Sequence, residues 1–199
     1  MVRMIKSLKY IICTVLFIAV FMLSAINAIG QLNADFSLDK DGGCAPLIVN
    51  MTNSTKGASV NAKYIWEFGN GNGSNLKDPG ATFYTPKAYS IKLTVIDGSQ
   101  TSSTTKTVNV YELPEVDFSF AGKSGCAPQT IVLKSKHVYE SYSYTWDLGN
   151  GVIKSGVDLS ELSYVYDNKI SPPISLSVSN SYGCINSKTV TNTIDVYES

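Results

Sequence analysis

The chain repeats itself after its first thirty residues, and this duplication constrains its fold more than any other feature. Five blocks of the first half return in the same order in the second half, for example Phe36 as Phe118 and Trp66 as Trp146. The first-half blocks are 34–37, 43–46, 66–71, 91–95 and 108–112, and their counterparts are 116–119, 125–128, 146–151, 174–178 and 194–198. Matched blocks with small drifts between them are typical of duplicated domains.

Each unit has the pattern of a β-sandwich. Apolar residues alternate with a period of two, as in Ile91, Leu93 and Val95, and clusters of turn residues separate the short strands. We find no convincing amphipathic helix. The sequence therefore predicts an all-β protein of two sandwich domains, 31–112 and 113–199, which a short, Pro-stiffened linker (Leu113-Pro114) places end to end as a semi-rigid rod.

The first thirty residues have the composition of a signal peptide. Three cations precede an apolar run at 11–23, and Ala28 and Gly30 put small residues at the positions that a signal peptidase recognises. We therefore predict a signal peptide, 1–30, and a mature chain that starts at Gln31 outside the cytoplasm, secreted or at the cell surface. An uncleaved membrane anchor is the alternative, although a span needs about 20 apolar residues.

The charge balance argues against nucleic-acid binding. The chain has 16 Lys and Arg against 16 Asp and Glu, and removing Arg3, Lys6 and Lys9 with the signal peptide leaves 13 cations. A slightly acidic chain without a basic patch is a poor partner for a phosphate backbone. We expect an extracellular protein or glycan as the partner, and contact with a membrane only through the signal peptide.

The repeated Trp-Asp/Glu-x-Gly-Asn-Gly block resembles the signature turn of the PKD domain, an immunoglobulin-like repeat. It comprises residues 66–71 and 146–151, and it departs from the family pattern at Glu67 for Asp, at Leu148 for Phe, and at Asn70 and Asn150 for the second Asp. The Gly-Cys-Ala-Pro blocks and 182–184 are similar to PKD repeats in surface proteins and adhesins of Bacteroidota. The resemblance covers nearly all of 32–199 and implies two immunoglobulin-like sandwiches.

The turn itself has the composition of a structural element. Glycines allow positive φ where the chain reverses, and each tryptophan precedes its turn in phase with apolar neighbours, so it should anchor the two sheets. The structural turn residues are Trp66, Gly69, Gly71, Trp146, Gly149 and Gly151. Glu67 or Asp147 could instead contribute to a calcium site, but one acid per turn is few for an ion that takes six to eight oxygens. We expect no metal and no cofactor.

Three cysteines follow the predicted signal peptide, and export would put them in an oxidising compartment. Cys126 opens the second repeat and Cys184 follows its 174–178 strand, so both could reach the same end of one sandwich, as the resemblance also suggests. We predict a Cys126–Cys184 disulfide. Cys44 lacks a partner within its own repeat because Asp97-Gly98-Ser99 offers no sulfur, and it could be a buried thiol, a vestige or an intermolecular link.

No catalytic constellation is recognisable. His137 is the only histidine, and no nucleophile elbow, zinc motif or phosphate loop is present. The second repeat is rich in tyrosines that either pack the sandwich or stack on sugars: Tyr139, Tyr142, Tyr144, Tyr164, Tyr166 and Tyr182. We expect an exported, non-catalytic module for adhesion, protein interaction or spacing, and a carbohydrate-binding accessory module of a hydrolase system as the alternative.

Overall fold

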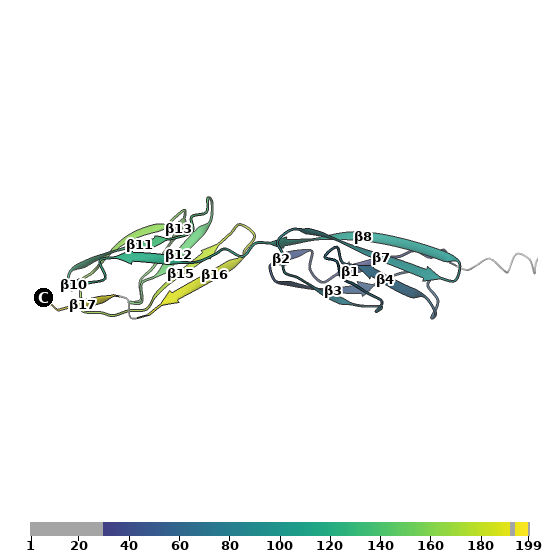
Figure 1. Ribbon diagram of the computed structural model, residues 1–199, viewed down its shortest axis with the longest axis horizontal. Helices are drawn as coiled ribbons and strands as arrows, with labels where there is room; N and C mark the ends of the chain where they lie inside the picture. The colour runs from purple at the N-terminus through teal and green to yellow at the C-terminus, as the bar shows by residue number, and fades with distance from the viewer. Residues whose placement is uncertain (1–29, 192–193, 199) are drawn as a thin grey trace, which may run out of the picture.

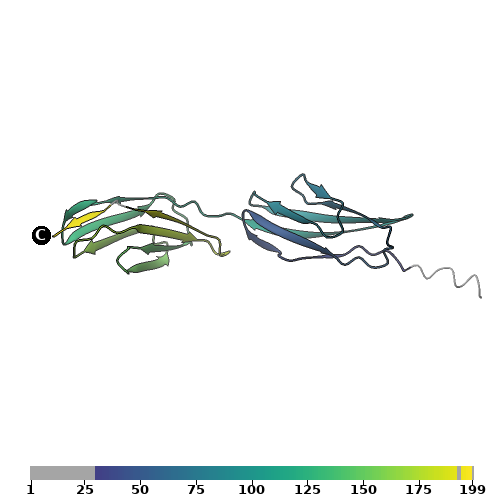
Figure 2. The same cartoon turned by 90° about the horizontal axis from the view of Figure 1, so that it is seen from below.

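The computed structural model describes residues 30–191 and 194–198, and their regular secondary structure consists of β-strands. No helix with the length and apolarity of a membrane span occurs in this part of the chain. Residues 1–29 of the predicted signal peptide (1–30) lie outside the described residues. The strands form two sandwiches that follow each other along one axis (Figures 1 and 2).

The first sandwich packs a three-stranded sheet, in the order β1-β3-β6, against a five-stranded sheet, in the order β2-β8-β7-β4-β5. Neighbouring strands are antiparallel except β2 and β8, which are parallel. The strands are β1 (Phe36–Leu38), β2 (Gly42–Cys44), β3 (Leu47–Asn53), β4 (Lys63–Glu67), β5 (Gly73–Ser74), β6 (Gly80–Phe83), β7 (Ala88–Asp97) and β8 (Gln100–Tyr111).

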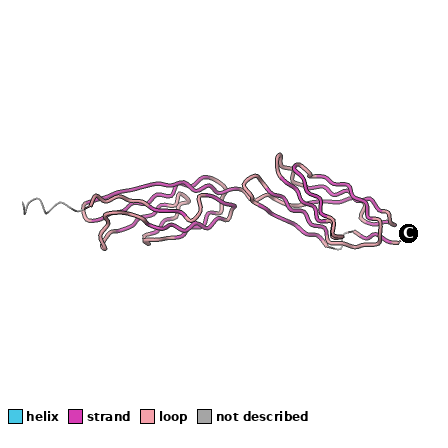
Figure 3. Tube along the Cα trace, turned by 180° about the vertical axis from the view of Figure 1, so that it is seen from behind, coloured by secondary structure: helices cyan, strands magenta, loops and turns pink. Residues whose placement is uncertain are grey.

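The second sandwich repeats this topology with one interruption. Its sheets have the orders β14-β11-β9 and β13-β12-β15-β16, and a parallel pair of β10 and β17 takes the place of the β2–β8 pair. The strands are β9 (Phe118–Ala121), β10 (Ser124–Cys126), β11 (Gln129–Ser135), β12 (Ser143–Asp147), β13 (Ile153–Val157), β14 (Glu161–Tyr166), β15 (Ile174–Ser179), β16 (Ile185–Val190) and β17 (Asp195–Tyr197). Figure 3 shows that loops connect the strands throughout both domains.

One tryptophan lies at the centre of each core. Trp66 on β4 packs edge to face against Phe36 of the opposite sheet, with ring centroids 5.0 Å apart, and Trp146 packs in the same way against Phe118 at 5.4 Å. Both tryptophans are almost fully buried. Their indole N–H groups donate to backbone carbonyls, at 2.9 Å and 3.0 Å, so burial leaves no polar atom of the ring unpaired.

The turn after each tryptophan depends on glycine. Gly69, Gly71, Gly149 and Gly151 all have positive φ, between 70° and 89°. A Cβ on Gly69 would lie 2.8 Å from a backbone oxygen of β7, and one on Gly149 would lie 2.2 Å from the carbonyl oxygen of Pro173. At these two positions glycine is therefore required by both conformation and space.

Replacement of either tryptophan should destabilise its own sandwich. We expect Trp66→Ala and Trp146→Ala each to lower the free energy of unfolding by about 3–5 kcal/mol, because a large buried ring leaves a cavity. Denaturant unfolding of the full chain measures this loss. Tyr84→Ala, at a side chain that is 75% exposed, is the control and should change stability by less than about 0.5 kcal/mol. A loss below about 1 kcal/mol for the tryptophans would contradict their role in the cores.

Candidate functional site

The feature that distinguishes this chain from two independent sandwiches is the junction between them. We define the junction as Cys44 and Tyr111 of the first sandwich, the linker 112–117, and the turn 180–186 of the second. The position of Cys44 follows from β2, which runs parallel to the last strand of its sandwich and pairs Cys44 with Tyr111. Cys44 therefore lies at the end of the domain from which the linker leaves.

The turn between β15 and β16 brings Cys184 to the same place from the other side. Asn180 begins this turn, and its side-chain oxygen accepts hydrogen bonds from the backbone N–H groups of Tyr182 and Cys184, both at 3.0 Å. Gly183 has a φ of 80°, which closes the turn. The side-chain amide of Asn180 donates to the carbonyl of Glu112 at 3.0 Å, so the turn contacts the linker directly.

A disulfide joins Cys44 to Cys184, with their Cα atoms 5.5 Å apart. The predicted Cys126–Cys184 pair is therefore wrong, as is the expectation that Cys44 lacks a partner in the chain. Cys126 is exposed and free. The bond between the repeats is compatible with their end-to-end arrangement, because Cys44 and Cys184 occupy facing ends of the two domains.

The direction of two strands explains the error. β11 starts beside Cys126, and β15 ends beside Cys184, and both strands run from the far end of the second sandwich toward the junction. Cys126 pairs with Tyr197 at the C-terminal end, whereas Cys184 lies against the linker. The two cysteines of the second repeat therefore lie at opposite ends of one domain, too far apart for a bond that needs Cα atoms within about 7 Å.

Noncovalent contacts surround the disulfide. The rings of Tyr111 and Tyr182 stack, with centroids 3.8 Å apart and planes 8° from parallel. The linker is held along its length, because the side-chain amide of Asn186 donates to the carbonyl of Pro114 at 2.8 Å and the N–H of Glu115 donates to the hydroxyl of Tyr139 at 3.0 Å. The junction is thus a set of one covalent bond, one stacked ring pair and several hydrogen bonds.

An ionic contact fixes the end of the linker. Asp117 accepts from the ammonium groups of Lys136 and Lys188, each at 2.7 Å. The hydrogen bonds from Lys136 and then Lys188 are the main reason that the pKa of the Asp117 carboxyl lies well below its ordinary value of 3.8. Since Lys136 follows β11 and Lys188 lies on β16, Asp117 connects the linker to both sheets of the second sandwich.

The first sandwich has no disulfide turn at the equivalent place. Its β7–β8 turn is one residue shorter, and Gln100 occupies the position of Cys184. The side chain of Gln100 accepts from the N–H of Leu32 at 3.0 Å, and the hydroxyl of Ser102 accepts from the N–H of Ala34 at 3.0 Å. Polar side chains of this hairpin thus bind the segment that enters the first sandwich, as Asn180 and Asn186 bind the linker that enters the second.

Asn70, Asn150 and Asp147 use their side-chain oxygens within the signature turns, and Glu67 uses its carboxylate in an ion pair with β7. The Asn70 and Asn150 side chains accept backbone N–H groups two residues ahead, Asp147 accepts the N–H of Gly149 at 2.9 Å, and Glu67 lies 3.6 Å from the ammonium of Lys92. No cluster of three or more His, Cys, Asp or Glu side chains that could hold a metal occurs within 30–191 and 194–198.

The tyrosines singled out in the sequence divide between core and surface. Tyr144 and Tyr166 are buried, and burial raises the pKa of the Tyr166 hydroxyl to about 12. Tyr139, Tyr142 and Tyr164 are half-buried and pack against the second core. Tyr182 is exposed, and one face of its ring stacks on the ring of Tyr111. His137, the only histidine, lies 3.5 Å from the Glu115 carboxylate and takes part in no catalytic arrangement that we recognise.

The sequence did not reveal the residues that bind the linker. Asn180 and Asn186 gave no signal as part of a motif, because their role depends on two domains meeting end to end. One signal was present: Val110-Tyr111-Glu112 matches Val196-Tyr197-Glu198 at the last position before each unit ends.

The disulfide should stabilise both sandwiches against unfolding. The bond closes a loop with a sequence separation of 140, and chain-entropy reasoning gives on the order of 5 kcal/mol for such a loop. We expect reduction, or Cys184→Ser, to lower the unfolding midpoints of both domains. Non-reducing peptide mapping should show Cys44 joined to Cys184. Cys126→Ser is the control and should change neither result; a peptide that joins Cys126 to Cys184 would contradict the assignment.

The contact of Asp117 with two lysines predicts a pH dependence with a definite sign. Because the pKa of Asp117 is lowered on folding, its contribution is present above the unfolded value of 3.8 and is lost as pH falls through the folded value. The double variant Lys136→Met/Lys188→Met should therefore be less stable than the parent chain at pH 7, and the difference should shrink below pH 3.8. Urea unfolding of both chains at pH 7 and below pH 3.8 measures this difference in the free energy of unfolding.

Lys154→Met provides the matched control, since the structure gives Lys154 no ion pair. It should behave like the parent at both pH values. A stability difference for the double variant that does not change with pH would show that Asp117 is not the group involved.

Known proteins contain sandwich domains similar to those of this chain. Residues 31–111 match the PKD domain family. The chain is similar to the PKD1 domain from Vibrio cholerae metalloprotease PrtV (29% identity, 41% of this chain and 98% of that one, TM-score 0.36) and to the PKD1 domain of Vibrio anguillarum Epp (30% identity, 41% and 95%, TM-score 0.34). A D1–D4 ectodomain fragment of ICAM-5 has the same fold at 14% identity, over 81% of this chain and 47% of the fragment, with a TM-score of 0.51. Residues 31–111 therefore form a PKD domain, and a second, immunoglobulin-like sandwich follows it.

Proposed function

We propose that the protein works outside the cytoplasm, secreted or at the cell surface, as a stiff, non-catalytic spacer that keeps what lies at its two ends a fixed distance apart. The disulfide between the two sandwiches is the observation that carries this proposal. The domains identified in the chain are PKD and immunoglobulin-like modules, which are typical of extracellular proteins built from many domains. We also propose that the second sandwich is a PKD repeat, since it repeats the signature turn of the first.

The position of the disulfide favours a spacer. A bond within one sandwich would stabilise that domain, whereas the Cys44–Cys184 bond fixes the relation between two domains. A disulfide of this kind persists in an oxidising compartment, which agrees with the predicted export.

The form of the linker supports the same role. A flexible tether would leave its backbone in water, but the carbonyls of Glu112 and Pro114 both accept hydrogen bonds from asparagine side chains of the second sandwich. Pro114 is buried, and its ring further restricts the backbone. The linker is therefore part of the packed structure, and the two domains extend in one direction (Figure 2).

The arrangement of the tyrosines favours the spacer over the carbohydrate-binding alternative. A sugar platform needs exposed, coplanar rings on one face. Among the tyrosines of 30–191 and 194–198, the three most exposed are Tyr84, Tyr182 and Tyr197. They belong to a loop of the first sandwich, to the junction and to the C-terminal end of the second sandwich. The rings of Tyr111 and Tyr182 are parallel but stacked face to face, so the ring surfaces between them are not open to a sugar, and Tyr139 and Tyr142 are stacked on each other in a similar way.

Mechanical stretching tests the proposed role. In a chain held at residues 31 and 198, force passes from Cys44 directly to Cys184, so the residues between them cannot be extended. Reduction should therefore add about 480 Å to the fully stretched length. The chain between the two cysteines, a separation of 140 residues at about 3.4 Å each, can then be extended. Force–extension curves with and without a reductant measure this difference.

Two variants make the measurement specific. Cys184→Ser should give the long extension without a reductant, and Cys126→Ser should behave like the parent chain. If the oxidised parent chain extends as far as the reduced one, the bond does not carry load and the proposed spacer loses its main support.

A further inference from the structure

The C-terminal end of the second sandwich repeats the end of the first sandwich that forms the junction. β10 runs parallel to β17 and pairs Cys126 with Tyr197, as β2 pairs Cys44 with Tyr111. The next residue repeats as well: the N–H of Ala127 donates to the carbonyl of Tyr197 at 2.9 Å, and the same bond joins Ala45 to Tyr111 at 2.9 Å. We define the C-terminal face as Cys126, Ala127, Tyr197 and Glu198.

The groups that bind the second domain at the junction are exposed on this face. In the first sandwich, Cys44 is bonded and Tyr111 is stacked on a partner ring at 3.8 Å. In the second, Cys126 is an exposed free thiol and the side chain of Tyr197 is 53% exposed. Cys44 and Tyr111 thus contact a following domain, whereas the equivalent residues Cys126 and Tyr197 are exposed.

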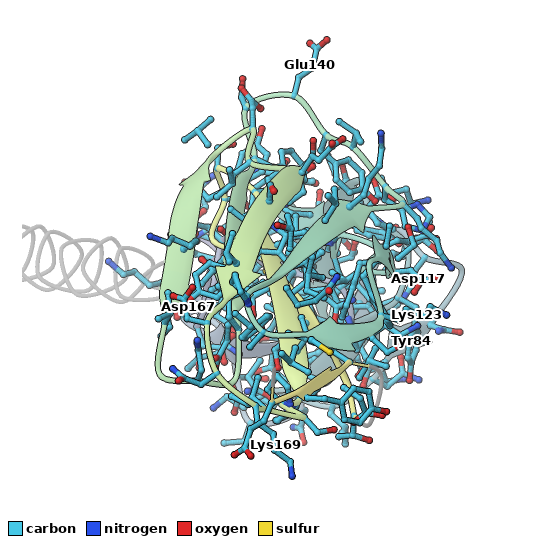
Figure 4. The ribbon with its side chains drawn as sticks, turned by 90° about the vertical axis from the view of Figure 1, so that its left-hand side faces the viewer. Tyr84, Asp117, Lys123, Glu140, Asp167 and Lys169 are labelled. Carbon is cyan, nitrogen blue, oxygen red and sulfur yellow. A yellow bond between two sulfur atoms is a disulfide. The ribbon has the colours of Figure 1, made fainter. Side chains whose placement is uncertain are left out.

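The surroundings of Cys126 leave room for a partner. An open hollow of about 410 Å³ lies beside it, lined by Ala127, Asp167, Asn168, Lys169 and Glu198. Figure 4 looks onto this end of the molecule, and Lys169 projects outward at its edge. At the junction, the carbonyl of the equivalent residue Glu112 accepts a hydrogen bond from the turn of the next domain.

We infer that the C-terminal face is a docking surface for a further sandwich domain in series, whose turn carries the sequence Asn-x-Tyr-Gly-Cys and whose cysteine forms a disulfide with Cys126. The inference rests on the junction seen in this structure. There the turn Asn180-Ser181-Tyr182-Gly183-Cys184 supplies the sulfur that bonds Cys44, the ring that stacks on Tyr111 and the amide that binds the Glu112 carbonyl.

A second copy of this chain does not fit the surface. Its Cys184 is already bonded to its own Cys44, and the corresponding hairpin of its first sandwich has Gln100 instead of a cysteine. The partner must therefore bring a turn whose thiol is still free.

Formation of the bond needs an oxidant, for which we name a low-molecular-weight disulfide. The Cys126 thiolate attacks one sulfur of this disulfide and releases one small thiolate. The turn thiolate of the partner domain then attacks the Cys126 sulfur in the mixed disulfide and displaces the second small thiolate. The protein loses two electrons, and the small disulfide is reduced to two thiols.

An extended chain tests the inference. Ser199 is replaced by a second copy of 113–199, which continues Tyr197-Glu198 with the same linker that follows Tyr111-Glu112. The appended copy carries Cys126→Ser, and Ile185→Val at an exposed position to give its turn peptide a distinct mass. The chain is equilibrated with reduced and oxidised glutathione, alkylated and mapped without reduction.

We expect Cys126 to be joined to Cys184 of the appended copy, while Cys44 stays joined to the original Cys184. Cys126→Ser in the extended chain should leave one alkylated thiol, on the appended turn. Tyr197→Ala should lower the equilibrium constant for formation of this bond against glutathione by roughly two- to tenfold, the effect of losing one aromatic pair.

Two results would overturn the inference. One is a chain in which the appended copy resists proteolysis like the parent domain but both thiols remain alkylated. The other is a Cys126 that links two extended chains instead of reaching the appended turn. If the appended copy is cleaved, one Gly is inserted after Glu198 and the same readout is repeated; failure of that chain to form the bond also counts against the inference. None of these results affects the Cys44–Cys184 bond on which the proposed spacer rests.

Discussion

The parallel pairing of β2 with the end of β8 is the constraint on which the junction depends. β2 has only three residues, and its direction decides where Cys44 lies. Had this segment paired near the beginning of β8, the thiol would lie close to the far end of a twelve-residue strand, roughly 35 Å away at about 3.4 Å per residue. Because β2 runs with β8 and ends beside Tyr111, the sulfur and the ring reach the next domain together.

The disulfide decides the rigidity of the junction because the other contacts are individually weak. Each hydrogen bond to the linker, and the Tyr111–Tyr182 stack, contributes about 0.5–1.5 kcal/mol. Fixing the backbone of a linker residue costs about 1–2 kcal/mol. The polar contacts and the stack therefore offset part of the cost of ordering the six linker residues but do not exceed it. The covalent bond keeps the two ends close, so the weaker contacts form between groups that are already neighbours.

Sequence reasoning succeeds where a local pattern has a local cause. The period-two strands, the buried tryptophans and the glycine turns all follow from residues within a few positions of one another, and the structure contains them. The disulfide depends instead on strand direction and on the meeting of two domains. The assumption that a repeat completes its own disulfide placed Cys126 beside Cys184, although β11 and β15 separate them by the length of a sandwich.

The unequal cysteine content of the repeats is the evidence that could have identified the correct pair. Both repeats have a cysteine in the Gly-Cys-Ala-Pro block, but only the second has one in the later hairpin. If each repeat formed a disulfide within itself, the absence of a hairpin cysteine in the first repeat would leave Cys44 as an unpaired thiol. If the bond instead joins one repeat to the next, the hairpin cysteine is needed only in a domain that follows another with a cysteine at its end. Cys184 meets that condition, whereas Gln100 occupies the same hairpin position in the first sandwich and binds the backbone of Leu32 instead.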